Sequence, residues 1–342
     1  MQALVISPDH LIPEELSDDP RSSPCWRISG INSSSIIDRR QYKKHLNEQN
    51  YFRFTGLDTT LLTQVLKNAR NCRDIRLDDQ DRPWGAAAIR RNTGLYPSSN
   101  AESDYSKFYF KSAVHVVIAA MTASEVPIAT LAINNGIERL HLHPSMLTFP
   151  ASHLDHVQWV NTITTLELTL DPGDGVAPQA WSKPLADFIM LFQQLECLDL
   201  YFDTRVEQSA FSALSQILEL PHLRTLKLAG VDCLPEDLSR LFNKHRSTLS
   251  EIFLEIIGIS TSTGGSWQIL LSEVRDRLQL TRLKMTQCDV NGDDICFAED
   301  YVDRSNIIDV IGEDPQLLDR LIKGIMKGTS ECEERTSIIK IV

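Results

Sequence analysis

The sequence predicts an α/β fold in which parallel strands and helices repeat along the chain. The first observation is a recurring phrase with apolar residues at its first, fourth and sixth positions, whose centres lie ~26–32 residues apart, a spacing typical of leucine-rich repeats. Its copies are Ile163–Leu168, Leu195–Leu200, Leu223–Leu228, Leu249–Leu254 and Leu280–Met285. The second observation is that helical patterns lie between the copies. We therefore predict an open leucine-rich-repeat solenoid, with parallel strands on its concave side and helices on its convex side.

Each repeat is explained by side-chain alternation in an extended strand. Leu198 and Leu200 face one way and enter a core, whereas Asp199 and Tyr201 face the other way. Apolar residues at helical spacing form one stripe per helix, in Leu185–Phe192, Leu238–His245 and Trp267–Val274. Because one strand and one helix cannot bury both of their faces, the units have to stack. The alternative is a doubly wound sheet, but its strands read as continuous apolar runs.

The repeat domain is predicted to span residues 1–288, with irregular units at its N-terminal end. Ile75 and Leu131 are about two periods apart, which indicates a unit that is either expanded or degenerate, and we interpret Ile137–Leu142 as an insert. The expected elements are a strand at 3–6, a loop at 9–38, helices at 39–49 and 61–69, a strand at 72–77, a loop at 78–104, a helix at 108–126 and a strand at 128–133.

Residues 289–342 are predicted to be an acidic C-terminal capping segment or tail. The pattern of repeats stops after Met285, and six acidic residues follow within 289–303. Apolar residues at Ile307–Ile311 and Leu317–Ile322 suggest one or two helices there. A segment of this kind would cover the last repeat, since an open solenoid end exposes a core.

Composition and charge restrict the class of partner. The chain is 42% hydrophobic and 23% charged, with a net charge of −12, and this balance argues against a nucleic-acid-binding surface. The longest apolar helical stretch, residues 113–121, is too short to cross a membrane. Seven cysteines are scattered without any C-x-x-C pair, which favours a reduced compartment. We therefore expect an intracellular protein, cytoplasmic or nuclear.

The sequence contains little that predicts catalysis or metal binding. His141, His143, His153 and His156 form the one histidine cluster, and a metal-dependent enzyme built on them is the least favoured alternative. The stretch from Asp289 has glycine at its fourth position and Asp300 at its twelfth, so it does not satisfy a calcium loop. The sequence has no P-loop, dinucleotide-binding, nucleophile-elbow or zincin motif. We predict no enzyme activity, no cofactor and no metal.

The concave strand positions are the predicted protein-binding site. They carry mixed charges and aromatic rings, which suit a polar partner surface with one or two anchors. The candidates are Glu167, Asp199, Tyr201, Lys227, Phe253 and Lys284.

Several phrases, in their order along the chain, resemble fungal F-box proteins with C-terminal leucine-rich repeats. The resemblance covers roughly residues 1–290. It rests on Leu223–Leu228, Asp237-Leu238, His245–Leu249 and Gly265–Trp267, and further back on Gln41–Gln49, Cys72–Ile75, Trp84-Gly85 and Gly94–Pro97.

The resemblance implies the substrate-recruiting half of a Skp–cullin–F-box ubiquitin ligase, in which the F-box binds the adaptor and the repeats bind a protein substrate. The F-box itself is not found. Leu11–Leu16 is similar to its opening, but Pro20 and Pro24 oppose the helices that should follow. Met1–Ile6 is similar to the first repeat strand after the box. We therefore expect either that the protein has lost the box or that the box is truncated from this sequence. A Skp-type adaptor is expected to bind only if the box is truncated. The alternative is a stand-alone repeat scaffold unrelated to ubiquitin.

Overall fold

The computed structural model describes residues 3–13, 38–78, 85–97, 104–134, 142–148, 158–172, 178–206, 208–260, 266–299, 303–305, 307–311 and 325–327. The chain divides into two compact units, Met1–Leu142 with Val157–Trp159, and His143–His156 with Val160–Val342. Parallel strands alternate with helices, β1–β3 in the first unit and β4–β8 in the second, which confirms the predicted α/β class. The predicted boundary near residue 288 lies inside the second unit.

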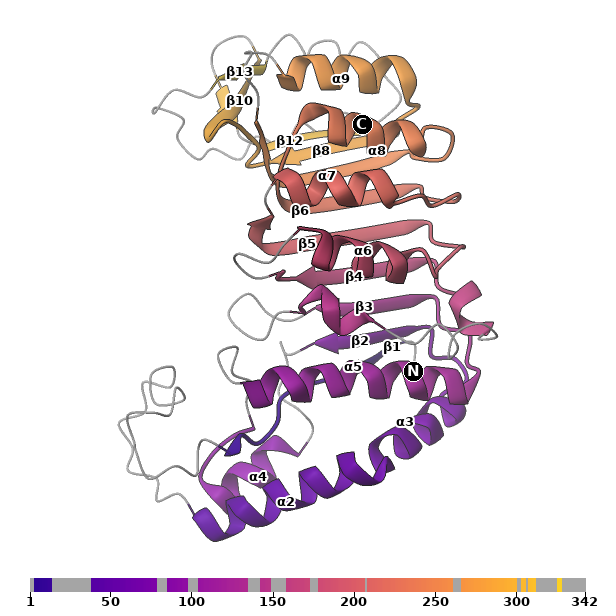
Figure 1. Cartoon of the computed structure of the whole chain (residues 1–342), viewed down its shortest axis with the longest axis vertical. Helices are drawn as coiled ribbons and strands as arrows, with labels where there is room; N and C mark the ends of the chain where they lie inside the picture. Colours follow the sequence, from indigo (N-terminus) through magenta and orange to yellow (C-terminus); the bar gives the residue numbers. More distant parts are fainter. Residues whose placement is uncertain are drawn as a thin grey trace. The chain divides into compact units, whose positions relative to one another are not determined.

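In its described residues, the first unit combines a short parallel sheet with several helices (Figure 1). Its strands are β1 (Ala3–Ile6), β2 (Asp74–Asp78) and β3 (Thr130–Asn134), and its helices are α2 (Arg39–Thr55), α3 (Leu57–Asn68), α4 (Ala86–Thr93) and α5 (Asp104–Ser124). Ile75 pairs directly with Leu131. The long interval, for which the sequence predicts an expanded or a degenerate unit, therefore connects two neighbouring strands.

The structure differs from the prediction in this unit. Helices α3 and α5 each begin about one turn earlier than predicted, and two differences are larger. Helix α2 does not end at Gln49 but continues to Thr55, where Gly56 adopts the left-handed conformation (φ 67°) that ends many helices. Helix α4 lies within the predicted loop 78–104. Only one apolar residue larger than alanine, Ile89, occurs in α4, so the helix shows almost no periodic apolar pattern.

Residues 11 and 12 are held against α2 by side chains of that helix. The hydroxyl of Tyr42 accepts from the Ile12 N–H at 2.9 Å and donates to the Ile12 carbonyl at 3.0 Å. Gln49 bonds both backbone groups of Leu11 in the same way. Leu11, Tyr42 and Leu46 form a buried cluster. The start of the F-box-like phrase is therefore packed against the unit, while Leu16, Pro20 and Pro24 lie outside the described residues.

His10 is a buried histidine that the fold holds neutral. Its Nδ1 bonds the Pro8 carbonyl at 2.9 Å, its Nε2 bonds Ser106 Oγ at 2.8 Å, and its ring stacks on Tyr109 at 4.2 Å. The pKa of His10 is lowered to about 4, mainly by burial; the Pro8 hydrogen bond opposes this effect and the nearby positive charge of Arg53 adds to it. The folded first unit is therefore favoured while the His10 imidazole is neutral, before it takes up a second proton.

Acidification is expected to destabilise the first unit through His10. A free imidazole takes up its proton below pH 6.5 but the folded one only near pH 4, so stability is lost as the pH falls through this window. Between pH 7 and pH 5 the loss should be about 2 kcal/mol. Urea titrations of wild type, His10→Gln and the exposed control His222→Gln test this. The pH dependence should be shallower only in His10→Gln, and an identical slope in all three proteins would contradict the assignment.

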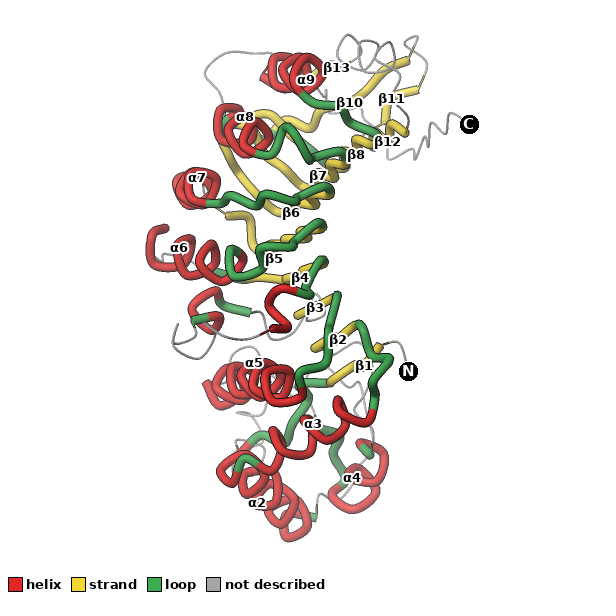
Figure 2. The backbone as a smooth tube through the Cα atoms, turned by 90° about the vertical axis from the view of Figure 1, so that its right-hand side faces the viewer, coloured by secondary structure: helices red, strands yellow, loops and turns green. Residues whose placement is uncertain are grey.

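The second unit is built on five parallel strands, β4 (Thr165–Leu170), β5 (Cys197–Val206), β6 (Thr225–Cys233), β7 (Glu251–Ile259) and β8 (Arg282–Thr286). Helices α6 (Pro178–Ile189), α7 (Gln208–Ile217), α8 (Pro235–Lys244) and α9 (Ser266–Arg277) follow the strands in turn. The short 3-10 helices η2 (Pro144–Leu147) and η4 (Gln158–Asn161) precede β4. Figure 2 shows α6–α9 together on one side of the strands.

The repeated phrase sets the register of this sheet. Its central residues pair strand to strand, from Leu166 through Leu198, Leu226 and Ile252 to Leu283, and each is at most 3% exposed. Every copy of the phrase therefore occupies the same level of the sheet, and its leucines pack beneath the helices, as predicted.

Three strands bend at one level, just beyond the phrase. Gly230 in β6, Ile256 in β7 and Gln287 after β8 have φ values of 71°, 53° and 50°, and all three follow the register row of Ala229, Glu255 and Thr286. On β5 the register with β6 shifts between Tyr201 and Val206 at the same place. Positive φ is uncommon for residues other than glycine and marks a local change of strand direction.

The C-terminal residues extend the second unit with further strands: β9 (Asp289–Val290), β10 (Asp293–Glu299), β11 (Asp303–Ser305), β12 (Ile307–Ile311) and β13 (Ile325–Lys327). The helix predicted at Ile307–Ile311 is wrong, because these residues form an antiparallel strand along β8. The pairing satisfies backbone groups of a strand that would otherwise be an exposed edge. Leu317–Ile322 lies outside the described residues.

None of the helices in the described ranges combines the length and the apolar character needed to cross a bilayer.

Candidate functional site

Five of the six predicted site residues form one row across the sheet of the second unit. Glu167 pairs with Asp199, Asp199 with Lys227, Lys227 with Phe253, and Phe253 with Lys284. Because neighbouring strands lie about 4.8 Å apart, the row places acidic, basic and aromatic side chains at regular intervals over five strands. Tyr201 lies one level further along β5. We call the sheet face that carries these six residues the polar face.

The polar face lies opposite the helices. Figure 2 shows α6–α9 on one side of the strands. Side chains alternate along each strand, and the leucines of the phrase are buried, so they face the helices and the residues between them face away. All six candidates are half-buried, rather than fully exposed as isolated strands would leave them. The reason is that residues on adjacent strands cover part of each side chain. Glu167 and Lys284 have such a neighbour on at least one adjacent strand, and the other four have one on both.

The centre of the row is an ion pair between Asp199 and Lys227. The Lys227 ammonium donates to Asp199 Oδ2 at 3.1 Å. The side chain of Lys227 is 40% exposed and that of Asp199 is 30% exposed. Burial raises the pKa of the Asp199 carboxyl although Lys227 opposes that rise. Burial lowers the pKa of Lys227, but the charge and hydrogen bond of Asp199 outweigh it, so that pKa lies above its ordinary value. Lys227 therefore keeps its positive charge at neutral pH, and that charge favours the ionised form of Asp199.

Phe253 is held between two cations of its own chain. The Arg282 guanidinium lies 4.9 Å from the centroid of the ring, and the Lys227 ammonium lies 5.9 Å from it. Contacts of this kind are worth roughly 0.5–1 kcal/mol at partly exposed sites. They fix the ring on the polar face, where its half-exposed surface remains available to a partner.

Tyr201 lies among carboxylates instead. It pairs with Ala229, and Ala229 pairs with Glu255. In this register row the small side chain of Ala229 is therefore all that stands between the Tyr201 ring and Glu255. Burial raises the pKa of the Tyr201 hydroxyl, and the negative charges of Asp203 and Glu255 raise it further.

The same face contains functional candidates that the sequence reasoning missed. They are Cys197, Asp203, Glu251, Glu255 and Arg282. Strand alternation could have identified them, since each is an even number of residues from a predicted site residue on its strand. The Cys197 thiol is protonated at neutral pH, because burial raises its pKa and the charge of Asp199 adds to that effect.

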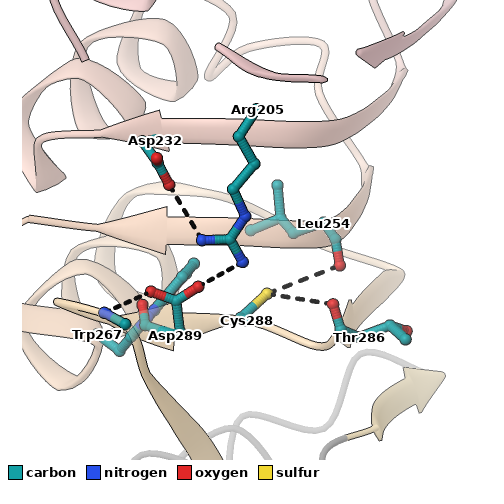
Figure 3. Close-up of polar contacts among 8 residues, drawn as sticks. Arg205, Asp232, Leu254, Trp267, Thr286, Cys288 and Asp289 are labelled. Carbon is teal, nitrogen blue, oxygen red and sulfur yellow. Dashed lines mark hydrogen bonds and ion pairs between the residues drawn. The ribbon is translucent and has the colours of Figure 1, made fainter. Parts of the chain in front are cut away.

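Beyond the bend, a second polar cluster joins β5, β6 and β9 (Figure 3). Arg205 lies 3.2 Å from Asp232 Oδ1 and 2.6 Å from Asp289 Oδ2. Gly258 lies between the two aspartates in register, and a Cβ there would meet Asp232 Oδ1 at 2.2 Å. The glycine therefore makes room for the guanidinium. The Asp289 carbonyl also accepts from the Trp267 indole at 3.0 Å, so this cluster anchors the C-terminal strands.

The remaining predicted sites are resolved only in part. Asp289 is taken up by Arg205 and by the Gly292 N–H at 3.0 Å, and Asp293–Glu299 is a strand rather than a calcium loop. Of the histidine cluster, only His143 is described, and it is half-buried; His141, His153 and His156 lie outside the described residues. Within the described ranges, no group of three or more histidine, cysteine, aspartate or glutamate side chains could hold a metal ion. Cys72, Cys197, Cys233 and Cys288 are free thiols.

Comparison with known proteins yields no relative. No protein-family model matches the chain, and no curated protein is significantly similar to it in sequence.

Proposed function

We propose that the chain is a leucine-rich-repeat protein-binding module that captures a protein partner on its polar face. The observation that carries this proposal is the continuous row from Glu167 to Lys284, which presents charged and aromatic side chains across five strands opposite the helices. Aromatic residues set among satisfied polar groups are typical of the centres of protein interfaces.

The resemblance to fungal F-box proteins supports the proposal that this module is the substrate-recruiting half of a ubiquitin-ligase receptor. The repeat period and the shared register of the phrase support the leucine-rich-repeat assignment. The module acts without chemistry of its own: its charged groups select the partner, and its rings contribute contact area.

Replacing Phe253 with alanine is expected to remove partner capture while the fold persists. Truncating a core phenylalanine costs about 3–5 kcal/mol, and the half-exposed Phe253 should cost well below that. Loss of an interface anchor should weaken binding by at least about 2 kcal/mol. The measurement is a quantitative pull-down from native extract paired with a thermal melt.

Ile269→Ala is the matched control, because Ile269 is a 59% exposed apolar residue on α9, on the helix side of the same unit. It should change neither the melt nor the capture. Capture that survives Phe253→Ala with an unchanged melt would show that Phe253 is not an anchor of the binding site.

A further inference from the structure

The polar face carries an excess of negative charge over β4–β7. Leaving out the Arg205 cluster, the described side chains that β4–β7 carry on this face include five carboxylates and one ammonium, that of Lys227. The carboxylates belong to Glu167, Asp199, Asp203, Glu251 and Glu255. Arg205, beyond the bend, is already held by two aspartates. The two cations of β8, Arg282 and Lys284, lie at the far end of the row.

The two aromatic rings of this face have opposite surroundings. Phe253 has a guanidinium and an ammonium beside it. Tyr201 has the carboxylates of Asp203 and Glu255 near it, and within the described part of the chain no cation lies over its ring. An aromatic ring attracts a cation to its face, and nearby carboxylates strengthen that attraction and add charge-assisted hydrogen bonds.

Register brings the parts of this second arrangement together. Tyr201 and Glu255 stand on either side of Ala229, two strand spacings or about 10 Å apart at the backbone. Asp203 follows Tyr201 by two residues on β5, and its negative charge raises the pKa of the Tyr201 hydroxyl, so the carboxylate lies near the ring. Ala229 is only 6% exposed, so the larger side chains around it cover its methyl group. A long, flexible cationic side chain could contact the ring and the two nearby carboxylates at the same time.

We propose that the polar face binds an extended basic segment of a partner protein, and that Tyr201, Asp203 and Glu255 together receive one arginine or lysine side chain of that segment. This inference rests on the proposed function and specifies the chemistry of its partner. Arginine is favoured over lysine, because its planar guanidinium can stack on the ring while donating to a carboxylate. The net charge of −12 would also draw a basic segment toward the molecule.

The test uses the full chain and a fluorescent eight-residue probe of alternating arginine and serine, with glutamate–serine and lysine–serine peptides as comparisons. Fluorescence anisotropy at low salt should show binding of the arginine peptide, weaker binding of the lysine peptide and none of the glutamate peptide. Tyr201→Ala and Glu255→Gln should each weaken binding of the arginine peptide at least fivefold. Glu236→Gln, which removes one exposed negative charge on α8, should change it less than twofold.

Several results would overturn the proposal: no binding of the arginine peptide, equal binding of the glutamate peptide, or equal losses in Glu236→Gln and Glu255→Gln. The third result would mean that the peptide senses net charge and not this site. Thermal melts of every variant exclude unfolding as the cause.

Competition in the pull-down separates this inference from the proposed function. If Phe253→Ala abolishes partner capture while the arginine peptide and Tyr201→Ala leave it intact, the basic segment is wrong and the binding module stands. If neither Phe253→Ala nor Tyr201→Ala affects capture, the proposed function itself fails.

Discussion

Gly230→Ala is expected to destabilise the second unit by at least about 3 kcal/mol, beyond the cost of most single substitutions. Gly230 has φ 71°, and a left-handed conformation alone costs an alanine about 1–2 kcal/mol. A Cβ at this position would also lie 2.1 Å from the carbonyl oxygen of Phe202. That atom belongs to the backbone of β5, so it cannot move aside as the end of a flexible side chain could.

Gly292→Ala separates the two contributions. Gly292 belongs to the same unit and has φ 83°, but a Cβ there would meet nothing within 4 Å. Its replacement should therefore cost only about 1–2 kcal/mol, the left-handed contribution by itself. Guanidinium titration of both variants gives the comparison. If the two losses are equal, the close approach of β5 and β6 at Gly230 is not what requires a glycine there.

Leu226→Ala is expected to cost about 2–5 kcal/mol, the range for truncating a buried leucine. Leu226 is 0% exposed and lies at the centre of the row of phrase leucines, with Leu198 on one side and Ile252 on the other. The strands beside it are fixed by hydrogen bonds, so they cannot close over the cavity that the truncation leaves.

Lys227→Ala, the adjacent residue on the opposite face, should cost less than about 1 kcal/mol. Its ion pair with Asp199 is 30–40% exposed, and pairs at such exposure contribute little to stability. Denaturant titration of the two neighbours tests the register of β6. A loss for Lys227→Ala as large as that for Leu226→Ala would show that the two faces had been exchanged.

The predictions from sequence succeeded where one strand or helix carries its own periodic pattern. The alternation in Leu195–Leu200 and its copies fixes which side chains face the helices, and the shared phrase fixes the register. They failed where local pattern is weak or ambiguous. Ile307–Ile311 is a short apolar run that suits a helix or a strand equally, and its pairing with the edge of β8 decides between them.

By itself, the sequence determined that the parallel strands alternate with helices, and which residues share the polar face, because side-chain direction follows from strand period alone. The tertiary structure decided what those residues do to one another. The Asp199–Lys227 pair, the two cations on Phe253 and the Glu255 carboxylate near Tyr201 each join different strands. Arg205 reaches Asp232 and Asp289 only because three strands bend together and Gly258 has no side chain. Such contacts depend on distances between segments far apart in the chain, and no local pattern encodes those distances.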